Sequence, residues 1–193
     1  MIRHASTGWN ESGRIQGRTD VPLSAFGRAQ AAAWRLPPDW VDTPCTTSPL
    51  RRARETAKLL GFADATCDAR LAEMGWGAFE GHRLDQLRAE LGPALAELER
   101  LGLDFQPPGG ESPRAVAARL SALLRELAAT GVQDHLLVTH KGVLRACLVL
   151  ALGWDMRGKA PVRLDPEEAL LFRLDGTGAP TFLEPVPLRR VAS

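Results

Sequence analysis

A short apolar run, from His135 to Thr139, limits the possible folds more than any other part of the chain, because it stands between two stretches with helical patterning. A run this short and this apolar indicates a strand that is covered on both faces. A helix is expected before it, from Ser112-Pro113 to about Ala129, and another after it, from about Gly142 to Leu152. A buried strand between two helices is typical of α/β folds with a parallel sheet.

The remaining chain continues this alternation of helices and strands. Its 193 residues are most simply a single domain, residues 1–193, large enough to bury a core without disulfides or a structural metal. Capping residues and apolar spacing predict helices over 24–36, from the Ser48-Pro49 pair to about Leu60, and over 84–101, and strands within 41–47, 65–67, 169–174 and 181–183. We therefore predict an α/β layer structure around a mostly parallel sheet.

Composition excludes several classes of protein. The formal net charge is only +1, so no nucleic acid or membrane partner is expected on electrostatic grounds. Cys45, Cys67 and Cys147 are widely spaced without a CxxC pair, which favours reduced thiols over disulfides or a zinc site. No signal peptide precedes the first motif and no apolar run approaches the ~20 residues of a membrane span, so we expect a cytoplasmic protein. Both a monomer and a homodimer remain open.

Two arginines and two histidines stand at predicted strand-to-helix junctions. Arg3 and His4 follow the first residues, Arg52 lies one turn after Ser48-Pro49, and His140 directly follows the apolar run. In a parallel sheet such junctions meet at one edge, beside helix N-termini. The four side chains can therefore surround one tetrahedral oxyanion. Arginine forks neutralise its oxygens, and a neutral imidazole can attack phosphorus.

A phosphoryl transfer also needs an acid for the leaving group, and Glu73 is the candidate. It stands just before a glycine-rich loop and could overhang the oxyanion pocket. Its pKa would have to rise toward neutrality, which partial burial and a nearby phosphate both favour. His82 and His135 are expected to be ordinary hydrogen-bonding histidines.

Five ordered segments carry a family resemblance. The first, Arg3-His4-Ala5-Ser6-Thr7-Gly8-Trp9-Asn10, resembles R-H-G-x-[ST]-x-x-N. The other four are residues 15–24, residues 48–57 (resembling S-x-L-x-R-A-x-x-T-A), residues 73–81 and residues 138–146. Together they resemble the histidine phosphatase superfamily, the phosphoglycerate mutase-like proteins, and most of all its small phosphatases such as α-ribazole phosphatase.

The resemblance implies a three-layer α/β/α sandwich in which residues 79–111 form a lid. It implies that His4 is the phosphorylated nucleophile, that Glu73 is the proton donor, and that no metal or cofactor is required. The residues expected to hold the phosphoryl group or touch the substrate are Arg3, Arg52, His140, Asn10, Thr7 and Gln16.

Three departures from the family pattern stand out. Ala5 replaces a glycine, which is tolerable only if its φ is negative. Lys141 replaces a small residue, and it either adds positive charge near the phosphate or extends into solvent. Only Met1 and Ile2 precede Arg3, where relatives carry a full strand, so we expect a truncated first strand or a mis-assigned start codon.

The expected function is hydrolysis of a small phosphorylated metabolite through a phosphohistidine. One alternative is a cofactor-dependent phosphoglycerate mutase, which returns the phosphate to its substrate. Another is a non-catalytic protein that binds a phosphorylated ligand. The sequence does not identify the substrate.

Overall fold

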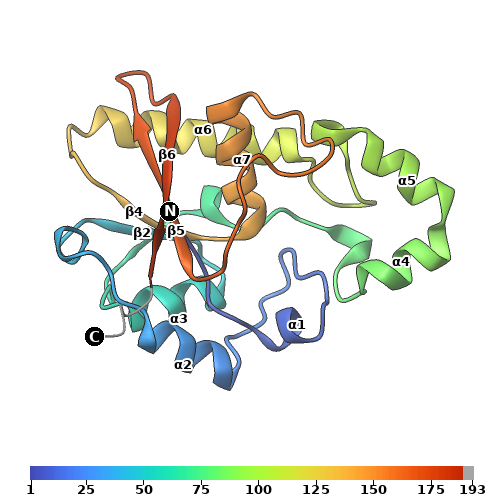
Figure 1. Ribbon diagram of the computed structural model, residues 1–193, viewed down its shortest axis with the longest axis horizontal. Helices are drawn as coiled ribbons and strands as arrows, with labels where there is room; N and C mark the ends of the chain where they lie inside the picture. Colours follow the sequence, from blue (N-terminus) through green and yellow to red (C-terminus); the bar gives the residue numbers. More distant parts are fainter. Residues whose placement is uncertain (189–193) are drawn as a thin grey trace.

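A sheet of six strands runs through the molecule in the computed structural model, which describes residues 1–188 (Figure 1). The strand order is β3-β2-β4-β1-β5-β6. Neighbours from β3 to β1 pair in parallel, whereas β5 pairs antiparallel with both β1 and β6. The strands are β1 (Ile2–Arg3), β2 (Cys45–Thr47), β3 (Thr66–Cys67), β4 (Leu136–Thr139), β5 (Glu168–Leu174) and β6 (Pro180–Pro187). The sheet is therefore mostly parallel, as predicted.

Helices cover both faces of this sheet (Figure 1). The helices are α1 (Gly8–Glu11), α2 (Ala25–Ala33), α3 (Arg51–Leu59), α4 (Leu84–Leu91), α5 (Pro93–Arg100), α6 (Pro113–Ala129) and α7 (Lys141–Leu152). Strand β4 shows the layering, because successive side chains of a strand point to opposite faces. Leu137 packs into the core with α6 and α7, whereas Leu136 packs with α2 and Val138 with α3. The predicted three-layer α/β/α sandwich is confirmed.

The first strand is as short as the sequence indicated. Ile2 is fully buried and pairs with Val138 of β4 on one side and Ala169 of β5 on the other. Two residues thus bring Arg3 and His4 to the middle of the sheet. The predicted domain covers 1–193, of which residues 189–193 lie outside the described residues.

Residues 79–111 lie between β3 and α6 and carry α4 and α5, which project to one side in Figure 1. Leu87 and Leu95 pack with Phe105 in the same cluster as α6. The single helix predicted over 84–101 is wrong, because Gly92 has a φ of 48° and Pro93 begins a second helix. A proline has no N–H to continue the first helix, and a glycine accepts the positive φ of the turn. That this segment acts as a lid stays a prediction.

The short strand predicted within 41–47 is confirmed as β2, after a short 3₁₀ turn at Pro38–Trp40, but one predicted boundary beyond it is wrong. The helix expected from Ser48-Pro49 begins at Arg51, with Leu50 still extended. The Ser48 hydroxyl accepts a bond from Leu50 N and lies 2.7 Å from Nε2 of His140. It therefore joins a distant segment as well as the turn before α3.

Candidate active site

The carboxyl ends of β1, β2 and β4 meet at one edge of the sheet, and the predicted pocket residues follow them. These three strands are parallel neighbours in the order β2-β4-β1. His4 follows β1 and His140 follows β4, and their ring centroids lie 5.0 Å apart. Arg52 lies in the first turn of α3, directly after the loop that leaves β2. The structure thus brings together side chains that are up to 136 positions apart, counted from His4 to His140.

His4 is held as a neutral ring with a defined tautomer. Its Nδ1 lies 2.7 Å from the carbonyl oxygen of Ala5, and because a carbonyl only accepts, we assign the proton to Nδ1. Burial, with the nearby charges of Arg3 and Arg52, lowers the pKa of His4 well below its ordinary value. The lone pair on Nε2 is consequently available at neutral pH, as a nucleophile requires.

His140 lies fully buried opposite His4. Its Nε2 is 2.7 Å from Ser48 Oγ, and its Nδ1 has no hydrogen-bond partner within residues 1–188. Burial is the main cause that lowers the pKa of His140 well below the ordinary value, and the neighbouring His4 and Arg52 add to it. The contact with Ser48 fixes the ring so that Nδ1 is left for another group.

The guanidinium of Arg52 is fully buried and anchored on the loop that follows α1. Its Nη1 donates to the carbonyl of Thr19 at 2.9 Å and its Nη2 donates to that of Gly17 at 2.8 Å. Gly17 has a φ of 55°, and a Cβ there would lie 1.9 Å from Oε1 of Glu80. Only glycine fits this position, so the loop that orients Arg52 depends on it.

Glu73 reaches the same edge and is 8% exposed. Its Oε1 accepts hydrogen bonds from the backbone N–H groups of Met74 at 2.8 Å and Gly142 at 3.0 Å. A Cβ on Gly142 would lie 2.3 Å from Oε1. The start of α7 therefore has room for the Glu73 carboxylate only because residue 142 has no side chain.

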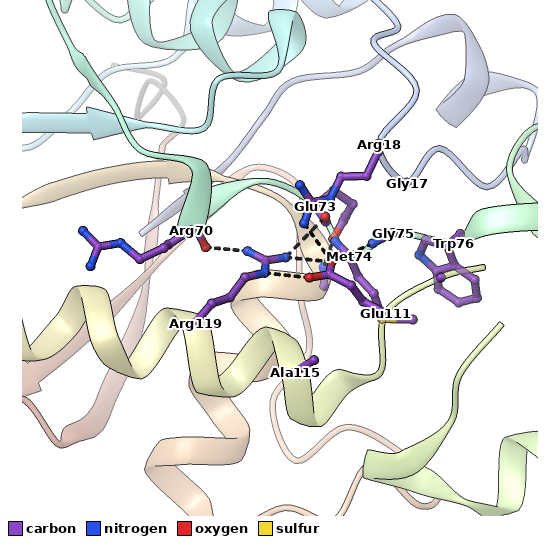
Figure 2. Close-up of polar contacts among 12 residues, drawn as sticks. Gly17, Arg18, Arg70, Glu73, Met74, Gly75, Trp76, Glu111, Ala115 and Arg119 are labelled. Atoms are coloured by element: carbon purple, nitrogen blue, oxygen red, sulfur yellow. Dashed lines mark hydrogen bonds and ion pairs between the residues drawn. The ribbon is translucent and has the colours of Figure 1, made fainter. Parts of the chain in front are cut away.

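An ion-pair network missed by the sequence analysis surrounds the backbone on both sides of Glu73 (Figure 2). Arg119, from α6, donates to the carbonyls of Arg70 and Glu73 and pairs with Glu111 at 3.1 Å. Glu111 also accepts from the N–H of Gly75 at 2.9 Å and pairs with Arg18 at 2.9 Å. No local pattern pointed to this network, because its members come from distant segments of the chain.

Several residues of this region carry buried polar atoms without partners. Among residues 1–188, six buried side-chain nitrogen or oxygen atoms lack a hydrogen bond. One of them, Trp34 Nε1, belongs to the residue that ends α2. The other five are Arg3 Nε, Arg52 Nε, His140 Nδ1, Gln16 Oε1 and Arg145 Nε. Buried donors without partners are costly, so the unpartnered Nε–H groups of Arg3 and Arg52, whose charges act on His4, favour a bound anion there.

Two predicted substrate contacts are engaged locally. Thr7 caps α1, accepting a bond from Asn10 N, while Oδ1 of Asn10 accepts from both the N–H and the hydroxyl of Thr7. Gln16 is 8% exposed. Contact of these three residues with substrate stays a prediction. Ala5 avoids positive φ, since Met156 is the one non-glycine residue of the described chain in that region, so the methyl group is tolerated.

Two kinds of feature are absent from the described residues. None of their helices is both long and apolar enough to cross a bilayer. No three His, Cys, Asp or Glu side chains within residues 1–188 lie close enough together to bind a metal ion.

An α/β sandwich with two histidines and two arginines at the carboxyl edge of its sheet defines a class of phosphoryl-transfer proteins. The profile of the histidine phosphatase superfamily (branch 1) matches residues 1–181, and the chain belongs to this family.

Named relatives of the chain include both mutases and phosphatases. "Probable phosphoglycerate mutase GpmB" of Salmonella paratyphi C is 32% identical over 153 residues, which are 77% of this chain and 71% of that protein. A crystal structure of phosphoglycerate mutase from Thermus thermophilus is 35% identical, with a TM-score of 0.70 over 97% of this chain and 96% of that one. A mycobacterial glucosyl-3-phosphoglycerate phosphatase is 32% identical, with a TM-score of 0.67 over 82% of both chains.

Proposed function

We propose that this protein is a phosphomonoesterase that hydrolyses a small phosphorylated metabolite through a phosphohistidine on His4, without a metal. One observation carries the proposal. His4 presents an unprotonated Nε2 beside His140, Arg3 and Arg52, and the buried Nε–H groups of both arginines lack partners among residues 1–188. Arginine charge neutralises the equatorial oxygens, a task that metal ions perform in other phosphoryl-transfer enzymes.

The first step forms a bond between Nε2 of His4 and phosphorus as the ester P–O bond breaks. Arg3, Arg52 and His140 hold the three non-bridging oxygens during this displacement. Glu73 gives a proton to the departing oxygen, so an alcohol leaves. In the second step Glu73 takes a proton from water, the water oxygen attacks phosphorus, and the P–N bond breaks to release phosphate and free His4.

A mutase is the second candidate, favoured by the names of the mutase relatives. It would use the same phosphohistidine but return the phosphate to an organic hydroxyl. The two activities differ in the fate of the phosphoenzyme. Fast release of inorganic phosphate identifies hydrolysis, whereas a persistent phosphoenzyme and isomerised phosphoglycerate identify the mutase.

Turnover of p-nitrophenyl phosphate tests the proposal. We expect the wild-type chain to release p-nitrophenolate and phosphate, His4→Ala to lose the activity, and His82→Ala to keep it, since His82 is exposed. Equal activity in His4→Ala would contradict the proposal. Binding of phosphate without any turnover would instead support a non-catalytic phospho-ligand binder.

We also propose a cytoplasmic location. Cys45, Cys67 and Cys147 are free thiols in the structure. Burial raises the pKa of Cys45 and of Cys147 to about 12, which keeps both thiols protonated and unreactive. Unpaired cysteines of this kind fit a reducing compartment.

A further inference from the structure

The half-buried carboxylate of Glu80 takes no part in the proposed chemistry, yet each of its oxygens accepts two hydrogen bonds. Its Oε1 accepts from the backbone N–H groups of Arg18 at 2.8 Å and Trp76 at 3.0 Å. Its Oε2 accepts from the N–H of Thr19 at 2.9 Å and from the hydroxyl of the same residue at 2.5 Å. Glu80 therefore contacts a turn at residues 17–19, although Arg18 lies 62 positions away in the sequence.

The same turn holds the guanidinium of Arg52. Its Nη1 donates to the carbonyl of Thr19 at 2.9 Å, and its Nη2 donates to that of Gly17 at 2.8 Å. Residues 17–19 lie outside every helix and strand, so no regular ladder of hydrogen bonds fixes these carbonyls. The backbone N–H groups of residues 18 and 19 both donate to Glu80, so this carboxylate holds the turn on the side away from Arg52.

One peptide group connects Glu80 with Arg52. The carbonyl of Gly17 and the N–H of Arg18 belong to the same planar trans peptide and point in opposite directions. The N–H donates to Oε1 of Glu80, and the carbonyl accepts from Nη2 of Arg52. Rotation of this peptide would break both bonds, so Glu80 fixes the direction of the carbonyl. A charged acceptor on the N–H also strengthens the bond that the carbonyl accepts, because linked hydrogen bonds polarise one another.

Packing and charge support this connection. A Cβ on Gly17 would lie 1.9 Å from Oε1 of Glu80, so the peptide lies directly against the carboxylate. Burial raises the pKa of Glu80, but the four bonds that it accepts outweigh burial and hold the pKa below its ordinary value. Burial lowers the pKa of Arg52, while nearby carboxylates, Glu80 among them, act in the opposite direction. The negative charge on Glu80 thus favours the buried positive charge that the phosphate site needs.

We propose that Glu80 is a positioning residue for phosphoryl transfer, which holds the peptide group between Gly17 and Arg18 and thereby fixes the guanidinium of Arg52. The inference rests on the proposed function, because it takes Arg52 to hold the phosphoryl oxygens. A second route from the same carboxylate must be distinguished from this one. Trp76 also donates to Oε1, so a change at Glu80 that acted through Trp76 would disturb the segment of the proposed acid instead.

Glu80→Gln tests the role with little change in shape. Both carboxylate oxygens face N–H groups, so either orientation of the amide places its NH₂ against a backbone donor. We expect kcat/KM for p-nitrophenyl phosphate to fall by about tenfold, and inhibition by inorganic phosphate to weaken by a similar factor. The loss should be the same for phenyl phosphate, because Arg52 acts on the phosphoryl oxygens rather than on the leaving group. A larger loss for phenyl phosphate, whose leaving oxygen needs a proton more, would overturn the proposed route.

A double-mutant cycle measures whether Glu80 acts through Arg52. Glu80→Gln is combined with Arg52→Lys, and kcat/KM is compared in the two backgrounds. We expect the tenfold loss to shrink to about twofold or less when Arg52 is already replaced, since residues that act through one contact are not additive. A merely structural role would cost the same factor in both backgrounds, and that result would contradict the positioning role.

Glu99→Gln is the matched control, because it removes an exposed carboxylate of α5 that pairs with Arg88. It should leave kcat/KM unchanged. If Glu80→Gln does not fold, Thr19→Val removes only one of the four bonds to the carboxylate. That variant should lose activity a few-fold and equally for both esters, and activity equal to that of Glu99→Gln would contradict the role.

The outcomes separate this role from the proposed function. If the chain hydrolyses p-nitrophenyl phosphate and Glu80→Gln behaves as Glu99→Gln does, the function stands and the positioning role falls. If neither ester is hydrolysed, the proposed hydrolase falls, and calorimetry with inorganic phosphate then tests the role. Binding weakened by Glu80→Gln, but not weakened further when Arg52→Lys is already present, would support it.

Discussion

The N–H of Gly142 donates to Oε1 of Glu73 across 3.0 Å, and this contact joins the proposed acid to the helix that begins after His140. The two residues are 69 positions apart in the sequence. Glu73 and His140 are thereby attached to the same helix start. The proposed activity should therefore depend on the absence of a side chain at 142.

Gly142→Ala should reduce catalysis by displacing Glu73. The new Cβ would lie 2.3 Å from Oε1, so the carboxylate must move. A positioned general acid contributes about 10²–10⁴-fold, and poor leaving groups depend on it most. We expect a drop of about tenfold or more in kcat for an alkyl phosphate and a smaller drop for p-nitrophenyl phosphate.

The leaving-group dependence distinguishes this effect from general damage to the fold. Gly176→Ala is the matched control, because nothing lies within 4 Å of a Cβ there and its φ is ordinary. Equal losses for both esters in Gly142→Ala would argue against displacement of the acid.

Arg119→Met should destabilise the segment that carries Glu73. The variant leaves the carbonyls of Arg70 and Glu73 without their donor and removes one of the donors to the carboxylate of Glu111, which keeps Arg18 and the N–H of Gly75 (Figure 2). Loss of charge-assisted bonds of this kind costs about 1–3 kcal/mol. Urea denaturation measures the free energy of unfolding, and kcat for an alkyl phosphate should fall with it.

Arg125→Met removes an exposed arginine of the same helix, whose guanidinium donates to the hydroxyl of Ser121, and serves as the control. Equal stability of the Arg119 and Arg125 variants would contradict a structural role for the Arg119 network.

Arg52→Lys should fail to replace the arginine. Lysine keeps the charge, but its three N–H donors radiate from a single nitrogen and do not reproduce the planar fork that reaches the carbonyls of Gly17 and Thr19 while Nε stays free. We expect kcat/KM for p-nitrophenyl phosphate to fall by about 100-fold. Inhibition by inorganic phosphate should weaken as well, and retained inhibition would place Arg52 outside the phosphate site. Arg54→Lys, on the exposed face of α3, is the matched control.

Stability should fall as the pH drops through the mildly acidic range. Burial and the nearby arginines lower the pKa values of His4 and His140 in the folded state, so the unfolded chain binds more protons below its own histidine pKa of about 6.5. The free energy of unfolding then decreases toward lower pH, by up to about 1.4 kcal/mol per pH unit for each histidine.

Denaturation between pH 5 and pH 7 measures this slope. It should become shallower in His4→Asn and in His140→Asn and stay unchanged in His82→Asn. An unchanged slope in both pocket variants would show that neither histidine is held neutral by the fold.

The sequence predicted the layers and the convergence of His4, Arg52 and His140, because side chains that follow parallel strands must meet at one edge. The sequence-based predictions failed where contacts between distant segments determine the structure. Helix α3 begins at Arg51 rather than after Ser48, because the Ser48 hydroxyl contacts His140, 92 positions away. The break at Gly92-Pro93 was readable from the dipeptide itself, but the apolar spacing of 84–101 favoured one helix.

The ion-pair network around the backbone of Glu73 could not be predicted, for the same reason. Glu111 lies in the loop before α6 and Arg119 lies within α6, eight residues further on. No local pattern predicts a contact at this separation. Only the packing of α6 against the segment around Glu73 brings them together. The network of Figure 2 is therefore a property of the tertiary structure rather than of any local pattern.

Trapping the phosphoenzyme tests the proposed role of His4 directly. The protein is mixed with a phosphate ester, quenched in alkali within milliseconds, digested, and the phosphorylated peptide is identified by mass spectrometry. We predict an acid-labile phosphate on His4 that disappears as inorganic phosphate is released. Steady hydrolysis with no phosphate on His4 at any time would contradict the account.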